Sequence, residues 1–229
     1  MCGIIGYNGF KGNSVEQNDI LKRMTSAMVH RGPDDSGTWV DEKAGVVLGH
    51  CRLSILDLSQ QGHQPMLSAD GRYAIVFNGE IYNFQQIREE LEKMGVSQRW
   101  RGHSDTEVIL AAVCHWGIEE AVKRFVGMFA IALWDREDRT LYLLRDRLGE
   151  KPLYYGWMGN VFLFGSELRT MRVHPAWRGE IDRDAVTLLL RHNFEWLIVD
   201  DGSNDGTAEL VAIRDLQDFM ERTGKVEIS

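Results

Sequence analysis

The chain opens with Met1-Cys2-Gly3-Ile4-Ile5-Gly6-Tyr7 and reaches a turn signal at Asn8-Gly9. A short apolar run that ends at an Asn-Gly pair is typical of a buried strand. Because a small residue follows the initiator methionine, we expect Met1 to be removed, which gives Cys2 a free α-amine beside its thiol. Such groups ordinarily have pKa values of about 8.5 and about 7.7–8.0, close enough for proton transfer at neutral pH. The alternative is that Cys2 is a small buried residue at the start of the strand.

Periodicity and turn residues predict the elements that follow. Helices are predicted over residues 17–30, 83–94, 104–116 and 182–191. A capping box of Asn83 with Gln86 is expected to open the second helix, and Ser104-Asp105-Thr106-Glu107 a similar box for the third. Strands are predicted over 37–40, 45–49, 53–57, 73–77, 128–134, 140–145, 153–157 and 161–165, the fourth breaking at Asn78-Gly79. This order favours sheets packed between helices over alternating βαβ units.

Composition and charge narrow the classes of function. The 229 residues are 44% hydrophobic and carry 26 basic against 34 acidic side chains, a net charge of −8. The basic residues are scattered, so nucleic acid is not expected as a partner. Cys2, Cys51 and Cys114 lack CxxC spacing, so neither a disulfide framework nor a metal site is expected, and the last two are expected to be core or half-buried. No signal peptide or membrane span is expected, and the expected location is the cytoplasm.

Several short strings occur in a fixed order along the chain. They are MCGIIG (1–6), HRGPD (30–34), RLSI (52–55), NGEIYN (78–83), SDTE (104–107) and RDRLGEKPLYY (145–155). Together they resemble the class II glutamine amidotransferase domain of glutamine-hydrolysing asparagine synthetases, from Met1 to about Asn193. That family belongs to the amino-terminal-nucleophile (Ntn) hydrolases, so the resemblance implies an α+β fold, a four-layer αββα sandwich.

The resemblance implies catalytic roles for Cys2, Asn78 and Gly79. Cys2 resembles the nucleophile that attacks the side-chain amide of glutamine, with its own α-amine as the base. The side-chain amide of Asn78 and the backbone N–H of Gly79 resemble the oxyanion hole, where fixed donors stabilise the charge that develops on the carbonyl oxygen. The alternative for Asn78-Gly79 is a hairpin turn, which this dipeptide favours, and a turn could also present such donors. His30 is expected to bond local backbone groups and is assigned no proton-transfer role.

The substrate-binding residues are likewise implied by the resemblance. Arg52 resembles the residue that holds the α-carboxylate of glutamine, since a guanidinium can grip a carboxylate bidentately, and Leu53, Ser54 and Ile55 complete this string. Asp105 resembles the carboxylate that binds the α-ammonium, and Glu80 adds a further contact. The alternatives are an ordinary strand arginine at position 52 and, at Asp105, an acid that only stabilises the start of a helix.

The end of the chain departs from the family. Residues 1–193 form the expected amidotransferase domain, whereas Phe194–Thr207 switches to a pattern that resembles the nucleotide-sugar-binding strand and turn of family 2 glycosyltransferases, a likeness covering about 194–210. Residues 194–229 are expected to form a short strand and helix as an appendage, not an independent domain, because they are too few for a doubly wound sheet. The Ser-Gly-Gly-x-Asp-Ser pyrophosphate loop of the family's synthetase domain does not occur in the sequence.

The leading hypothesis is a glutaminase that forms glutamate and ammonia through a γ-glutamyl thioester on Cys2, without an ATP-dependent synthetase domain in these residues. No cofactor is expected for this reaction, since ATP and Mg would belong to the synthetase domain. Expected partners are L-glutamine, a synthetase domain or chain in trans, and a second copy in a homodimer. The alternatives are an inert truncated or fused fragment that acts only as an interaction module, and a sugar transferase that uses Asp200 and Asp201.

Overall fold

The structure is a computed structural model that describes residues 1–53, 62–96 and 100–179. The chain divides into two compact units, Met1–Gly179 and Glu180–Ser229, and the description below concerns the first. The helix predicted over 182–191, the boundary at Asn193 and the appendage over 194–229 lie outside the described residues, as does most of the strand predicted over 53–57.

Two antiparallel sheets form the centre of the first unit. The five-stranded sheet has the order β2 (Asp35–Asp41), β3 (Val46–Arg52), β1 (Gly3–Asn8), β9 (Val161–Gly165), β8 (Tyr154–Met158). The four-stranded sheet has the order β4 (Met66–Leu67), β5 (Tyr73–Ile81), β6 (Gly127–Asp135), β7 (Thr140–Arg145). The opening strand β1 is therefore central, paired with β3 on one side and β9 on the other.

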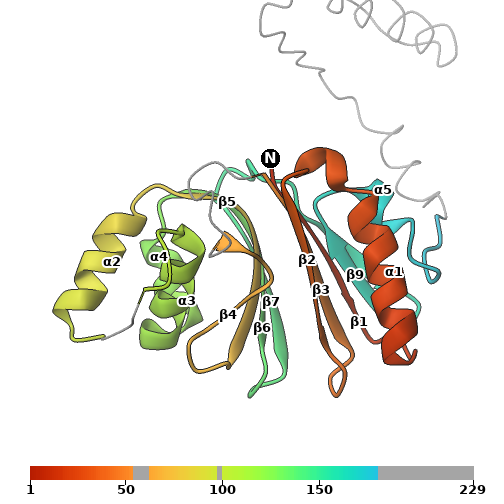
Figure 1. Cartoon of the computed structure of the whole chain (residues 1–229), viewed down its shortest axis with the longest axis horizontal. Helices are drawn as coiled ribbons and strands as arrows, with labels where there is room; N and C mark the ends of the chain where they lie inside the picture. The colour runs from red at the N-terminus through yellow and green to blue at the C-terminus, as the bar shows by residue number, and fades with distance from the viewer. Residues whose placement is uncertain (54–61, 97–99, 180–229) are drawn as a thin grey trace, which may run out of the picture. The chain divides into compact units, whose positions relative to one another are not determined.

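Helices cover the outer face of each sheet (Figure 1). The four-stranded sheet is covered by α2 (Phe84–Lys93), α3 (Asp105–Trp116) and α4 (Ile118–Arg124). The five-stranded sheet is covered by α1 (Ser14–Ser26) and the short α5 (Leu168–Met171), with the 3-10 helix η1 (Val29–Arg31) after α1. The layers run helix, sheet, sheet, helix, which confirms the predicted α+β αββα sandwich.

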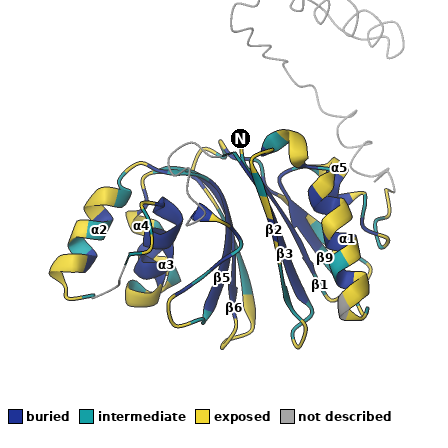
Figure 2. Cartoon of the chain, viewed as in Figure 1, coloured by how far each residue is buried: buried dark blue, intermediate teal, exposed yellow. Residues whose placement is uncertain are grey.

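Alternating side chains in the strands contribute to three apolar clusters. Figure 2 shows that the central strands of both sheets are mostly buried. In β5, Ile75 and Phe77 pack against the helices α2–α4, whereas Ala74 and Val76 face the other sheet. The same alternation in β1 sends Ile5 towards α1 and Ile4 between the sheets. The central strands β1 and β5 are thus buried on both faces, so their register cannot slip by one residue without moving apolar side chains to the wrong layer.

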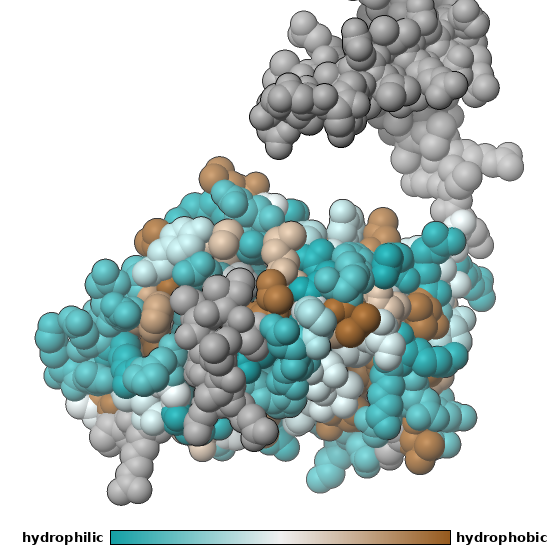
Figure 3. Space-filling model, turned by 45° about the horizontal axis from the view of Figure 1, so that its top comes forward, coloured by the Kyte–Doolittle hydropathy of each residue, from teal (hydrophilic) through white to brown (hydrophobic). Residues whose placement is uncertain are grey.

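The outer surface is mainly polar. On the face that Figure 3 shows, hydrophilic residues predominate and apolar residues form small separate groups. Among the described residues, no helix is both long and apolar enough to cross a membrane.

Local predictions failed where tertiary pairing or another hydrogen-bond partner intervened. Asn78-Gly79 does not form a turn, because β5 continues through it to Ile81 and pairs with β6 at every residue from Tyr73 onward. Neither predicted capping box forms. The Asn83 side chain bonds Arg124 O and Val126 N instead of capping α2, and although Ser104 caps α3 as expected, the Glu107 carboxylate accepts from the N–H groups of residues 101 and 102.

Two further sequence expectations concern α1 and the cysteines. Helix α1 begins at Ser14, earlier than predicted, because Asn13 and Glu16 form a capping box there. Cys51 is buried as expected, whereas Cys114 is exposed, because the end of α3 turns it away from the core. Its thiol lies 3.9 Å from Asp70 Oδ2.

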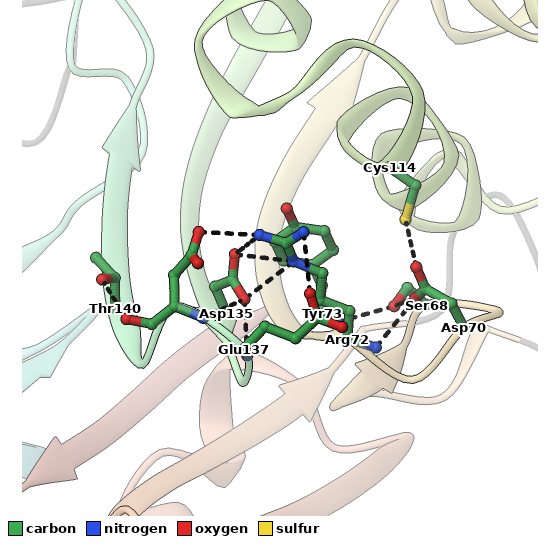
Figure 4. A network of polar contacts seen from close by, with 9 residues as sticks. Ser68, Asp70, Arg72, Tyr73, Cys114, Asp135, Glu137 and Thr140 are labelled. Atoms are coloured by element: carbon green, nitrogen blue, oxygen red, sulfur yellow. Dashed lines mark hydrogen bonds and ion pairs between the residues drawn. The ribbon is translucent and has the colours of Figure 1, made fainter.

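A polar network joins β5 to the turn between β6 and β7 (Figure 4). Asp135, 1% exposed, accepts hydrogen bonds from Arg72 Nε at 3.1 Å and Nη2 at 2.6 Å. It also accepts from the backbone N–H groups of Glu137 and Asp138. Burial alone would raise the pKa of Asp135, but these donors outweigh burial and hold the pKa below its ordinary value. The buried carboxylate therefore fixes both the hairpin and the start of β5.

Candidate active site

One pocket collects residues from both sheets and from the start of α3. Its described lining comes from the chain terminus, the end of β3, the second half of β5, the segment before β4, and single positions on β6 and the loop before β8. The residues are Met1, Cys2, Arg52, Leu53, Gly62, Gln64, Phe77, Asn78, Gly79, Glu80, Ser104, Asp105, Thr106, Met128 and Lys151. Every described residue of the predicted site is in this set, whereas Ser54 and Ile55 lie outside the described residues.

Cys2 lines the pocket and lies directly before the central strand β1. Its half-buried thiol accepts a hydrogen bond from Leu53 N–H at 3.4 Å and lies 3.6 Å from Leu53 O. Its carbonyl accepts from Arg31 Nε at 3.0 Å. Met1 also lines the pocket, with its sulfur 3.6 Å from Lys151 Nζ. Removal of Met1 would therefore open space in the pocket and expose the α-amine of Cys2 to it.

Asn78 and Gly79 lie side by side in the interior of β5. Asn78 is 1% exposed, and its side-chain nitrogen Nδ2 is a buried donor with no hydrogen-bond partner among the described residues. A buried unpaired donor is costly, and such groups in folded proteins call for a functional explanation. At Gly79 a Cβ would collide with the Met128 carbonyl and lie 2.7 Å from the Phe129 Cα. Only glycine lets β5 approach β6 at this position.

Arg52 is held against the backbone of Gly62. The residue is 8% exposed, and a Cβ on Gly62 would lie 2.7 Å from the Arg52 Cζ. On the other side, Asp34 N–H donates to Arg52 O at 3.1 Å, and Gly32 packs closely on the Arg52 backbone. Gly62 was not predicted as a site residue, because its role depends on a contact with a residue ten positions earlier in the chain.

Asp105 lies at the first position of α3, with its carboxylate buried in the pocket wall. It is 6% exposed, and Oδ2 accepts from Ile81 N–H at 3.1 Å. Burial raises the pKa of Asp105 to about 6, the nearby charge of Glu80 adds to the rise, and hydrogen bonds from Ile81 and Thr106 N–H oppose it. Among the described residues, the groups that favour the ionised carboxylate are these backbone N–H donors, and they do not offset its burial.

Gln64 is a pocket residue that sequence reasoning missed. Its Oε1 accepts from Phe77 N–H at 2.6 Å and its Nε2 donates to Thr106 Oγ1 at 3.2 Å. Strand β4 pairs with β5 only at Ile75 and Ala74, so the edge of β5 beyond them is completed by this side chain. Gln64 thus ties the strand that carries Asn78 to the helix that carries Asp105. No local pattern around it signals this role.

Charged side chains form a second layer behind Cys2, outside the pocket lining. The Glu167 carboxylate pairs with Arg31 Nη1 at 3.1 Å and with His30 Nε2 at 2.9 Å. Arg169 contacts the other oxygen of Glu167 at 3.3 Å and His30 Nδ1 at 3.0 Å. The prediction that His30 bonds backbone groups is therefore wrong, because η1 turns its ring towards α5. Within residues 1–53, 62–96 and 100–179, no three His, Cys, Asp or Glu side chains come together as a metal site would require.

Comparison with known proteins agrees with this geometry. The model of a family described as "Glutamine amidotransferase domain" matches residues 1–200. The chain belongs to this family. Asparagine synthetase [glutamine-hydrolyzing] 3 of Bacillus subtilis is 39% identical over 189 residues, which cover 82% of this chain and 30% of the relative. A putative asparagine synthetase [glutamine-hydrolyzing] 2 of Methanocaldococcus jannaschii is 39% identical over 212 residues, covering 85% and 40%. The amidotransferase chain thus spans well under half the length of these relatives.

Solved structures support the same fold. The glutamine phosphoribosylpyrophosphate amidotransferase of B. subtilis, complexed with ADP and GMP, aligns with a TM-score of 0.64 at 20% identity over 75% of this amidotransferase chain and 43% of the other. A structure described as the allosteric regulatory enzyme of purine biosynthesis aligns with a TM-score of 0.66 at 20% identity and the same coverage. The predicted family and fold class are confirmed, whereas the predicted glycosyltransferase likeness of residues 194–210 finds no support in these comparisons.

Proposed function

We propose that this chain hydrolyses L-glutamine to glutamate and ammonia, with Cys2 as the nucleophile. The observation that carries the proposal is the buried Nδ2 donor of Asn78, which has no hydrogen-bond partner among the described residues and lies in the pocket that also holds the Cys2 thiol. A donor left unpaired in the resting protein is available to a substrate oxygen. Glutamine is the substrate of the amidotransferase family, and this pocket also carries groups suited to both ends of an amino acid.

Arg52 and Asp105 are suited to hold the α-carbon groups of glutamine. The guanidinium of Arg52 would pair with the α-carboxylate, and the buried carboxylate of Asp105 would pair with the α-ammonium. Glu80, half-buried next to them, adds a second negative charge for the ammonium. The raised pKa of Asp105 supports this assignment, because a cationic ammonium beside the buried carboxylate would favour its ionised form. The side-chain amide of the substrate then extends towards Cys2.

The thiol of Cys2 passes its proton to the α-amine freed by loss of Met1, and the sulfur attacks the amide carbon of the substrate. The resulting oxyanion accepts hydrogen bonds from Asn78 Nδ2 and Gly79 N–H. Alternate N–H groups of an antiparallel strand point to one edge, and those of Phe77 and Ile81 reach Gln64 Oε1 and Asp105 Oδ2 at the edge of β5 away from β6. The N–H of Gly79 lies between them and is directed to the same side.

Collapse of this intermediate completes the reaction. The α-ammonium of Cys2 gives its proton to the leaving nitrogen, ammonia departs, and a γ-glutamyl thioester remains on the sulfur. Water then attacks the thioester carbonyl in the same oxyanion hole, with the α-amine as base. Glutamate leaves and the thiol regains its proton. No cofactor takes part in this scheme.

The ammonia acceptor is proposed from the relatives. Both relatives above are named as glutamine-hydrolysing asparagine synthetases, and the matched region covers 30% and 40% of their lengths. We infer that ammonia passes to an ATP- and Mg-dependent synthetase domain or chain, with homodimer formation a further proposal. Three free cysteines in the described chain fit a reducing compartment such as the cytoplasm.

Substitution of Cys2 tests the proposal. Cys2→Ala should abolish ammonia release from glutamine while glutamine binding, measured by calorimetry, persists through Arg52 and Asp105. An electrophilic glutamine analogue such as a diazoketone should label Cys2 in a peptide map. Cys51 is an internal control, because burial raises the pKa of its thiol to about 11 and leaves little thiolate at neutral pH.

Two outcomes contradict the proposal. Undiminished ammonia release by Cys2→Ala, or label on Cys51 or Cys114, would refute the amino-terminal nucleophile. A well-folded protein that begins at Cys2 yet neither releases ammonia nor takes up label would favour the inert interaction module instead.

A further inference from the structure

The charged layer behind Cys2 connects Glu167 to the nucleophile through a single arginine. Arg31 donates from Nη1 to Glu167 Oε1 at 3.1 Å and from Nε to the Cys2 carbonyl at 3.0 Å. The Arg31 side chain is 10% exposed and that of Glu167 21% exposed, so water screens this pair only in part. Burial alone would raise the pKa of Glu167, but hydrogen bonds from His30 and Arg31 outweigh it and hold the pKa below its ordinary value. Glu167 is therefore ionised at neutral pH.

The position of Glu167 is fixed by the central strand itself. The preceding residue, Ser166, donates its N–H to Ile4 O at 2.8 Å and accepts from Ile4 N–H on its hydroxyl at 3.0 Å. Ile4 is two residues beyond Cys2 in β1. The backbone directly before Glu167 is therefore held to β1, the strand that follows Cys2, by one hydrogen bond that Ser166 donates and one that it accepts. From the other end of the residue, the Glu167 carboxylate contacts Arg31, which in turn bonds the carbonyl of Cys2 just before β1.

The contacts from Glu167 through Arg31 to the Cys2 carbonyl affect the position of the nucleophile once Met1 has been removed and Cys2 is the first residue. A terminal residue lacks a preceding peptide to restrict it, so rotation about its Cα–C bond moves its amine and thiol together. The Arg31 bond to the Cys2 carbonyl holds the Cys2–Gly3 peptide plane and therefore fixes the axis of this rotation, while the Leu53 N–H bond to the Cys2 sulfur at 3.4 Å limits the rotation itself. Because the reaction needs sulfur and base in one productive geometry, small misplacements are costly in rate.

We propose that Glu167 is a positioning residue for the nucleophile, acting through Arg31 on the carbonyl of Cys2. The proposal rests on the glutaminase function proposed above. Neither Glu167 nor Arg31 is in the described lining of the pocket, so neither is expected to contact glutamine. Loss of Glu167 should therefore lower the rate of the chemical step and leave the affinity for glutamine unchanged.

A purely structural role is the competing explanation. Glu167 also bonds His30 and Arg169, and Arg169 donates to Ala27 O at 2.8 Å, so this cluster joins α5 to the end of α1. Arg169 provides the matched comparison. It contacts the Glu167 carboxylate from the other side but has no bond to Arg31 or Cys2 among the described contacts. Removal of Arg169 loosens the junction of α5 and α1 and keeps the path from Glu167 to Cys2.

The experiment compares Glu167→Ala, Glu167→Gln and Arg169→Gln with the wild type, using steady-state ammonia release and thermal unfolding. Glu167→Ala should lower kcat by about tenfold to a hundredfold with KM for glutamine unchanged, since a hydrogen bond to a charged group is lost from the nucleophile's support. Glu167→Gln should lose less, because its amide oxygen still accepts from Arg31. Arg169→Gln should keep the wild-type kcat even where its Tm falls as far as that of Glu167→Ala.

A second readout does not depend on turnover. The rate at which iodoacetamide alkylates Cys2 should fall in Glu167→Ala and should stay at the wild-type value in Arg169→Gln. Wild-type kcat and Cys2 alkylation in both Glu167 variants would overturn the proposal, as would an equal loss of kcat in Arg169→Gln. Absence of ammonia release from the wild type itself would instead contradict the proposed function, and the alkylation comparison would still test the positioning of Cys2.

Discussion

At the scale of single residues, Asp105 is expected to make glutamine binding depend on pH. Its pKa is about 6 in the folded protein, and only the ionised form can pair with the α-ammonium of glutamine. We therefore expect KM for glutamine to rise as the pH falls below about 6 and to be constant above about 7. Ammonia release measured from pH 5 to pH 8 tests this expectation. Asp105→Asn should raise KM at neutral pH and remove its pH dependence in this range. A constant wild-type KM down to pH 5 would contradict the role.

The same carboxyl should affect stability with a defined sign. Because its pKa is raised on folding, the folded protein binds this proton more tightly than the unfolded chain. The contribution of Asp105 to stability is therefore greatest below about pH 4 and is lost as the pH rises to about 6. The difference in unfolding free energy between the wild type and Asp105→Asn, from urea titrations at several pH values, isolates this contribution. A difference that does not change between pH 4 and pH 7 would show that the pKa is not raised.

Substitution of Asn78 is expected to lower kcat strongly and to change the unfolding free energy little. Loss of an oxyanion donor ordinarily lowers kcat by about 10²–10³, so Asn78→Ala should show a fall of this size. The donor Nδ2 has no described partner in the resting protein, so its removal relieves a desolvation cost that offsets part of the lost packing. We expect the unfolding free energy to change by less than about 1 kcal/mol. A large loss of stability with an unchanged kcat would assign Asn78 a structural role.

At the scale of elements, local signals predicted strands well where turns bound them on both sides. The predicted limits of β7 and β9 agree with the structure, since each lies between turn residues. The strand predicted to end at Phe77 continues because β6 offers partners as far as Gly127, and this pairing overrides the turn preference of Asn78-Gly79. Gly62, Gln64 and Glu167 could not be assigned to the site region from sequence. Their contacts depend on which strands become neighbours, and no single-chain pattern encodes that.

The buried carboxylate of Asp135 should be the main support of the β6–β7 hairpin. Asp135→Ala would leave two backbone donors and the Arg72 guanidinium without their common acceptor, at a cost of about 2–4 kcal/mol. The exposed neighbour Glu137 gives the control, and Glu137→Gln should stay within about 0.5 kcal/mol of the wild type. Because the folded pKa of Asp135 is lowered, its contribution should be lost as the pH falls below about 4. Urea titration measures both variants, and equal stabilities would contradict the assignment.

At the scale of the whole molecule, the described lining of the pocket lies well before residue 193 in the chain. Its last lining residue is Lys151. A chain shortened to residues 1–193 is therefore expected to keep the kcat and KM of the full chain for glutamine hydrolysis. Ammonia release and circular dichroism of the two proteins provide the comparison. Loss of turnover in a shortened chain that is still folded would show that residues after Asn193 contribute to the site.

The central position of β1 in its sheet bears on when Met1 can be removed during synthesis. β1 is the first strand to be synthesised, and its partner β9 follows only after residue 160. Until then, the nascent chain can offer β1 no neighbour on that side, so its first residues stay accessible to the aminopeptidase that removes Met1. In the folded chain that still carries Met1, this residue lines the pocket beside Lys151 and remains exposed. A tag fused before Met1 would keep the α-amine of Cys2 in a peptide bond, so it is expected to abolish ammonia release however well the protein folds.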